Sequence, residues 1–150
     1  TMGDAYRKLG ELTGMAEAAE TLAAYCETVY ARTLELADSV ERVNLLYCLG
    51  NEGLNVIAQG SYHAEIIDLL ANWNPDVILF APGSIYAVVG EDAAWKQVAA
   101  IQSGAYYEVP FGPYNWMGFP PSVQRYLGML WMAELLYPEA AEDDLYAEVA

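Results

Sequence analysis

Two short groups of aromatic and polar residues carry the side chains in this sequence that suit ligand binding best. They are Ser61-Tyr62-His63 and Tyr114-Asn115-Trp116. A rigid aromatic ring with a polar edge can stack on a flat or chelating ligand at little cost in conformational entropy. We therefore expect ligand contacts from Tyr62, His63, Tyr114, Asn115 and Trp116. The alternative for Tyr114 and Trp116 is a small satellite core packed beneath their loop.

His63 is the only histidine in the chain, and we consider it the candidate metal ligand. Imidazole binds iron, copper and zinc, whereas tyrosinate and carboxylate suit ferric iron as a hard cation. The alternative for His63 is a residue at the start of a helix that hydrogen-bonds to the backbone. Glu65 follows two residues later. It is either a solvated helix residue or a surface carboxylate that meets an arginine on a partner.

The sequence offers little support for catalysis or for a resident cofactor. A catalytic triad needs a base beside a nucleophile, but His63 is the single histidine, and Cys26 and Cys48 have apolar neighbours. We interpret the cysteines as two buried thiols or as one incidental bridge. The sequence has no glycine-rich phosphate-binding motif. Its Cys and His residues are also too few for a typical structural zinc site.

The charge balance argues against polyanionic partners. Six Lys and Arg against 21 Asp and Glu give a formal net charge of -15, which repels nucleic acids and anionic membrane surfaces. This acidity fits a solvated exterior, and the alternative is that some carboxylates face a partner. At 150 residues, 55% of them hydrophobic, the chain suits one folded domain. No apolar run reaches the ~18 residues of a membrane span, and the sequence begins like an excised or mature fragment.

Elements that alternate between helix and strand must position the candidate residues. Apolar residues at helical spacing predict a long helix over 15–40, after a first helix over 2–12 that ends at Gly14. Continuous apolar runs predict buried strands, and Pro120-Pro121-Ser122 begins a helix that Pro138 ends. The expected strands span 42–49, 54–59, 77–81 and 105–109, and the later helices span 62–71, 92–101, 121–137 and 139–150. This alternation predicts an α/β sheet whose strand-end loops hold the ligand.

Several segments, taken in order, resemble a known protein family. Three of them are Leu9-Gly10-Glu11-Leu12-Thr13-Gly14, Gly60-Ser61-Tyr62-His63-Ala64-Glu65 and Asn74-Pro75-Asp76-Val77-Ile78. The most specific is the closing run Val109-Pro110-Phe111-Gly112-Pro113-Tyr114-Asn115-Trp116, followed by Pro120-Pro121-Ser122 and Leu130-Trp131-Met132-Ala133-Glu134. Over nearly its whole length the chain resembles the substrate-binding proteins of ABC importers for iron-siderophore complexes, haem, cobalamin and related metal chelates.

The resemblance implies a fold and an organisation, because this family has two α/β lobes joined by one long helix. The chain is expected to be a three-layer C-terminal lobe, in which helices flank a central, mostly parallel sheet and a long helix precedes it. Residues 1–14 would be the end of the connecting helix and 15–150 the C-terminal lobe, with the N-terminal lobe absent. A family segment of about 20 residues, a common length for such a connection, is expected to be missing near 71–73.

The resemblance also implies a function without enzymatic activity or an intrinsic cofactor. It predicts an extracytoplasmic component, periplasmic or a cell-surface lipoprotein, that acts as a monomer and delivers a small metal chelate to an ABC permease. The ligand is open between a ferric chelate such as an iron-siderophore, haem, a cobalamin and an oxyanion such as molybdate. Glu65, with Asp68 as the alternative, is the expected permease-docking residue. The competing classes are a metallocluster enzyme, a small α/β hydrolase, and a structural or dimerisation domain.

Overall fold

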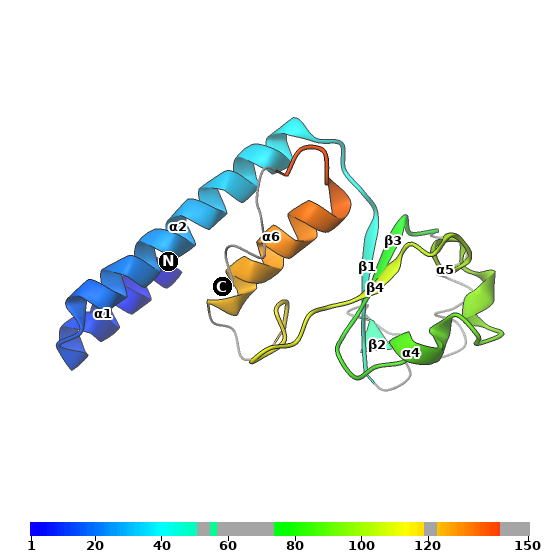
Figure 1. Cartoon of the computed structure of the whole chain (residues 1–150), viewed down its shortest axis with the longest axis horizontal. Coiled ribbons are helices and arrows are strands. Elements are labelled where there is room, and N and C mark those ends of the chain that lie inside the picture. Colours follow the sequence, from blue (N-terminus) through cyan, green and yellow to red (C-terminus); the bar gives the residue numbers. More distant parts are fainter. Residues whose placement is uncertain (51–54, 57–73, 119–122, 142–150) are drawn as a thin grey trace. The chain divides into compact units, whose positions relative to one another are not determined.

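The computed structural model describes residues 1–50, 55–56, 74–118 and 123–141 (Figure 1). The chain forms two compact units: the helical unit comprises Thr1–Arg42 and Trp116–Ala150, and the sheet unit comprises Val43–Asn115. Chain length predicts a single core, whereas each unit gathers its own buried side chains. The assignment of 1–14 to the end of a connecting helix and of 15–150 to a C-terminal lobe stays a prediction.

Two helices begin the helical unit. Helix α1 spans Met2–Thr13, and its first turn is closed by a capping box in which the Thr1 side chain accepts from the backbone N–H of Asp4. Gly14 ends α1 with a φ of 74°, a left-handed conformation that costs glycine little. Helix α2 then spans Ala16–Ser39. The two predicted helices and the bend between them are confirmed.

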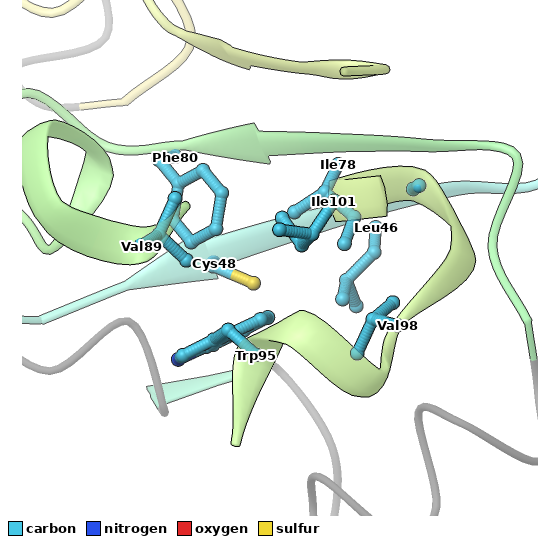
Figure 2. Close-up of a cluster of buried hydrophobic side chains, with 9 residues drawn as sticks. Leu46, Cys48, Ile78, Phe80, Val89, Trp95, Val98 and Ile101 are labelled. Carbon is cyan, nitrogen blue, oxygen red and sulfur yellow. The ribbon is translucent and has the colours of Figure 1, made fainter. Parts of the chain in front are cut away.

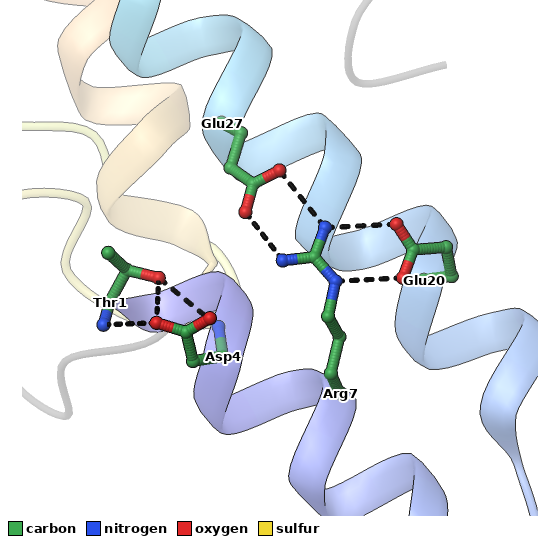
Figure 3. Close-up of polar contacts among 5 residues, drawn as sticks. All are labelled: Thr1, Asp4, Arg7, Glu20 and Glu27. Atoms are coloured by element: carbon green, nitrogen blue, oxygen red, sulfur yellow. Dashed lines mark hydrogen bonds and ion pairs between the residues drawn. The ribbon is translucent and has the colours of Figure 1, made fainter.

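Small residues and one arginine hold α1 against α2. Gly10 lies so close to α2 that a Cβ at this position would collide with the Cβ of Ala19. Arg7 reaches across the same interface and makes two bidentate ion pairs (Figure 3). Its Nε and Nη2 donate to Glu20 at 2.8 and 2.9 Å, and its Nη1 and Nη2 donate to Glu27 at 2.7 and 3.0 Å. Fork-shaped pairs of this kind fix geometry as well as adding attraction.

Helix α6 completes the helical unit and spans Gln124–Leu136. Its buried residues include Leu130 and Ala133, and it packs against α2, whose Cys26 and Val29 are buried. The hydroxyl of Tyr137 donates to the backbone carbonyl of Glu41 at 2.8 Å, which ties the end of α6 to the segment after α2. The helix ends just before Pro138, as predicted, while its predicted start at 120–122 lies outside the described residues.

The sheet unit contains four described strands in the order β2-β1-β3-β4. They are β1 (Leu45–Leu49), β2 (Asn55–Val56), β3 (Val77–Phe80) and β4 (Tyr106–Glu108). Strands β1, β3 and β4 are parallel, and β2 pairs antiparallel with β1. A mostly parallel sheet with intervening helices confirms the predicted α/β class. The three predicted strands that became β1, β3 and β4 are each shorter than expected.

One face of the sheet carries the core of this unit (Figure 2). Alternate residues of two parallel strands point to this face, which Val89, Trp95, Val98 and Ile101 cover from the connecting segment. The sheet contributes Leu46, Cys48, Ile78 and Phe80. Trp95 meets Phe80 edge to face, with ring centroids 5.4 Å apart, an arrangement that aromatic pairs favour.

The connecting segment corrects one sequence prediction. A single helix was expected over 92–101, but the chain forms a 3-10 turn, η1 (Trp95–Gln97), and then a short helix, α5 (Ala99–Ser103). The fully buried Val98 between them is extended, with φ −85° and ψ 128°. Packing of Trp95, Val98 and Ile101 on the sheet therefore overrides helix propensity. Another short helix, α4 (Tyr86–Val89), was not predicted.

The predicted helix over 62–71 lies entirely outside the described residues. The same is true of most of the predicted strand over 54–59, of which Asn55–Val56 is described. In the predicted final helix, the described residues 139–141 form part of a turn.

We expect the ion pairs of Arg7 to make stability depend on pH. Hydrogen bonds from Arg7 lower the pKa of the Glu20 and Glu27 carboxyls from the ordinary value of 4.5. Their contribution is therefore complete above pH 4.5 and is lost as the pH falls through the lowered values. Arg7→Met should lower the free energy of unfolding at pH 7, and the difference from the wild type should shrink as the pH falls below 4.5.

Urea unfolding at a series of pH values measures this difference. Lys8→Met is the matched control, because Lys8 pairs with Glu11 through side chains that are 69% and 63% exposed, and such pairs contribute little. An Arg7→Met deficit that stays constant from pH 7 to pH 3 would show that the carboxylates do not carry the effect.

Candidate functional site

The parallel strands β1, β3 and β4 all finish at the same end of the sheet. In open α/β sheets, ligands bind at this carboxyl end, which we call the carboxyl edge. Backbone hydrogen bonds continue the ladder into the loops that leave this edge. The N–H of Ala81 donates to the carbonyl of Cys48, and the N–H of Val109 donates to that of Phe80, each at 2.9 Å. The loops after β3 and β4 therefore start from fixed positions.

The loop after β4 forms a tight aromatic hairpin, residues 111–115. Phe111 and Asn115 are joined by an antiparallel bridge, and the N–H of Gly112 donates to the carbonyl of Tyr114 at 3.1 Å. The peptide bond between Gly112 and Pro113 is cis. Phe111 is 68% exposed and Tyr114 48% exposed. The hairpin thus presents two aromatic side chains at the surface, where Tyr114 is not packed beneath its loop.

A polar contact anchors this hairpin to the sheet. The Asn115 Nδ2 donates to the hydroxyl of Tyr47 at 3.2 Å, across 68 residues of sequence. Tyr47 lies in β1 between two residues whose side chains are in the core on the opposite face. Sequence reasoning missed Tyr47, because it lies in an apolar run that was interpreted as a strand. The signal that could have revealed Tyr47 is its polar hydroxyl group. Tyr47 lies between Leu46 and Cys48, whose side chains enter the core, so its own side chain points to the other face.

A second contact connects the loops after β3 and β4. Glu108, the exposed last residue of β4, accepts a hydrogen bond from the N–H of Gly83 at 3.1 Å. Gly83 has a φ of 73°, which suits glycine. The neighbouring Ser84 has a buried hydroxyl oxygen without a hydrogen-bond partner among the described residues. This edge therefore combines an exposed carboxylate with backbone and hydroxyl groups.

The predicted site residues in the described part of the chain belong to two different units. Tyr114 and Asn115 lie together in the sheet unit, whereas Trp116 belongs to the helical unit. The carbonyl of Trp116 lies against Gly128 of α6, where a Cβ would collide with it. Tyr62, His63, Glu65 and Asp68 lie outside the described residues, so their roles stay predictions.

Neither cysteine supplies a reactive thiolate in the folded chain. Cys26 and Cys48 are free and buried, which bears out the interpretation as two thiols over that as a bridge. Burial raises the pKa of Cys26, and it raises that of Cys48 to about 12. Across the described ranges, no group of three or more His, Cys, Asp or Glu side chains is placed to hold a metal ion. None of the helices in these ranges is long and apolar enough to cross a membrane.

No family model matches this sequence, and no curated protein does so either. Solved structures do match. An ABC transporter solute-binding protein from Sulfurospirillum deleyianum is 25% identical with a TM-score of 0.84, and the match covers 98% of this chain and 54% of that chain. A periplasmic solute-binding protein from Veillonella parvula is 22% identical with a TM-score of 0.82, over 98% and 53%. The chain has the fold of a lobe of these binding proteins.

The molybdate periplasmic binding protein MolA of Haemophilus influenzae is more distant in structure. It is 21% identical with a TM-score of 0.69, and the match covers 98% of this chain and 52% of that protein. The chain therefore spans about half the length of each of these three structures. All three are solute-binding proteins, and two of them belong to ABC transporters.

We expect Tyr47 and Asn115 to be energetically coupled. Tyr47→Phe and Asn115→Ala each remove the same hydrogen bond, so the double variant should be more stable than the sum of the two losses predicts, by about 0.5–1 kcal/mol. Urea unfolding of the four proteins measures this coupling. Tyr47→Phe combined with Gln102→Ala is the control pair, because Gln102 bonds the carbonyl of Lys96 instead. If the stability losses of Tyr47→Phe and Asn115→Ala are additive in the double variant, the hydrogen bond between these residues does not anchor the hairpin.

Proposed function

We propose that this chain is the ligand-binding C-terminal lobe of an extracytoplasmic solute-binding protein, and that the whole protein delivers a small metal chelate or related solute to an ABC permease. The observation that carries the proposal is the aromatic hairpin. The hairpin follows the carboxyl end of β4 in the parallel sheet, and it exposes Phe111 and Tyr114. The hydrogen bond from Asn115 to Tyr47 holds it at this end of the sheet. The lobe-like fold and the solute-binding proteins that share it support this assignment.

The site would work by stacking and not by chemistry. Exposed aromatic rings held on a rigid sheet lose little freedom when a ligand covers them. Tyr62, His63 and Trp116 remain proposed contacts, with His63 as the proposed metal ligand. We also propose that residues 1–14 end a connecting helix and that an N-terminal lobe supplies the opposite wall of the cleft. The match over about half of each solved structure supports this organisation.

The proposed ligands are a ferric chelate, haem, a cobalamin or an oxyanion. The molybdate-binding protein among the similar structures supports an oxyanion as a proposed ligand. A Saccharomonospora viridis protein of a ferric hydroxamate transport system supports a ferric chelate as a proposed ligand. These are transported solutes, so the proposal includes no resident cofactor and no enzymatic activity.

Titration with a ferric hydroxamate, haem, a cobalamin and molybdate, followed by tryptophan fluorescence, tests the proposal. At least one of them should bind. Phe111→Ala and Tyr114→Ala should each weaken that binding by about 1 kcal/mol or more, which is about five-fold or more. Val88→Ala is the matched control, because Val88 is an apolar side chain of the sheet unit that is 59% exposed and lies on α4. Binding that is unchanged in both hairpin variants would place the site elsewhere.

Docking to the permease is a separate part of the proposal. An acidic side chain on the lobe would pair with a basic residue of the permease and speed their encounter. Glu65 is the proposed residue, with Asp68 as the alternative. In cells that carry the whole transport system, Glu65→Arg should abolish uptake while the purified protein still binds its ligand. Glu91→Arg, a charge reversal at another exposed residue of the sheet unit, should leave uptake intact. Normal uptake by Glu65→Arg would exclude Glu65 as the docking residue.

A further inference from the structure

Most of the positive charges of this chain belong to the unit that does not carry the aromatic hairpin. Five of the six Lys and Arg residues belong to the helical unit. Within this unit, Arg7 binds Glu20 and Glu27, and Lys8 binds Glu11. The sheet unit contains seven Asp and Glu residues but one lysine, Lys96, and no arginine. His63 is the only other side chain there that can become positive, and it counts as neutral in the formal charge.

Lys96 belongs to the layer that covers the core face of the sheet. It lies in η1 beside Trp95, which packs against the side chains of Cys48 and Phe80. The aromatic hairpin is instead anchored at Tyr47, whose side chain points to the other face because adjacent residues in a strand alternate. The single lysine of the sheet unit is therefore on the face opposite to the hairpin anchor.

The groups that the site does present favour positive charge. Glu108 is an exposed carboxylate three residues before Phe111, and its hydrogen bond from Gly83 restrains it at the sheet edge. The faces of Phe111 and Tyr114 are electron-rich, and aromatic faces attract cations. The net charge of -15 adds a long-range field that attracts cations and repels anions.

From this arrangement we propose that the aromatic hairpin and Glu108 select a solute that presents a positively charged group, and that they discriminate against anions. The inference rests on the proposed function and narrows its ligand class. Among ferric chelates it favours those with a free ammonium group over those rich in carboxylates, because carboxylate-rich ligands are matched by the planar fork of arginine.

A series of three ligands with one chelating core tests the inference. The ferric complex of a linear trihydroxamate with a terminal amine is cationic at its tail when the amine is free, neutral there when it is acetylated and anionic when it is succinylated. Titration of the whole, two-lobed protein at pH 7.5 and low ionic strength should show affinity falling in that order, by about 2- to 5-fold at each step, the range expected of exposed charge pairs. Equal affinities, or tighter binding of the succinylated complex, would overturn the inference while leaving the proposed function standing.

Glu108→Gln tests the residue that carries the charge. The glutamine carbonyl can still accept from the Gly83 N–H, so the loops should stay connected while the charge is lost. Affinity for the free amine should fall by about 2- to 5-fold, and affinity for the acetylated complex should not change. Glu91→Gln removes one charge from another exposed position of the sheet unit and should affect neither. Equal losses for both ligands in Glu108→Gln would overturn the selective role of Glu108.

If no ferric hydroxamate binds, the titrations with molybdate, haem and a cobalamin test the inferred preference for positive charge. Molybdate and haem are anionic at neutral pH, so binding of either overturns the inference. A cobalamin should bind more tightly in a cationic form than in a neutral form, and the reverse order overturns the inference. No response to any ligand contradicts the proposed function itself, and the inference falls with it.

Discussion

Parallel pairing of β1, β3 and β4 is the constraint on which the candidate site depends. Cys48 pairs with Phe80, and Phe80 pairs with Glu108, so the three strands end together and their loops leave from one edge. The register is fixed because Cys48 and Phe80 are fully buried against Trp95, and a slip of one residue would turn them to the other face. The core on one face thus determines where the aromatic hairpin starts.

Charge is used differently in the two units. In the helical unit, Arg7 serves the structure, since its forked pairs with Glu20 and Glu27 fasten α1 to α2. In the sheet unit, Lys96 is the only Lys or Arg, and the strand-end loops present Glu108, Phe111 and Tyr114. A binding surface made of aromatic faces and a carboxylate holds a ligand by stacking and weak attraction.

Local patterns predicted much of the fold. The helix over 15–40, the end of α1 at Gly14 and the parallel strands follow from apolar spacing and glycine chemistry, which act within a few residues. The helix expected over 92–101 is wrong because the sheet, and not the local sequence, decides how Trp95, Val98 and Ile101 are buried. For the site, the sequence located Tyr114 and Asn115 but missed Tyr47, whose contact with Asn115 spans 68 residues.

The sequence by itself determined the α/β class, the acidity of the chain and the presence of aromatic residues at a strand end, since these depend on composition and short-range pattern. Only the tertiary structure decided that Tyr114 is exposed, that Asn115 is anchored to Tyr47 and that the carbonyl of Trp116 lies against Gly128 of α6. The reason is that these contacts join segments far apart in the chain. Their geometry depends on the strand register and helix packing, which no local pattern specifies.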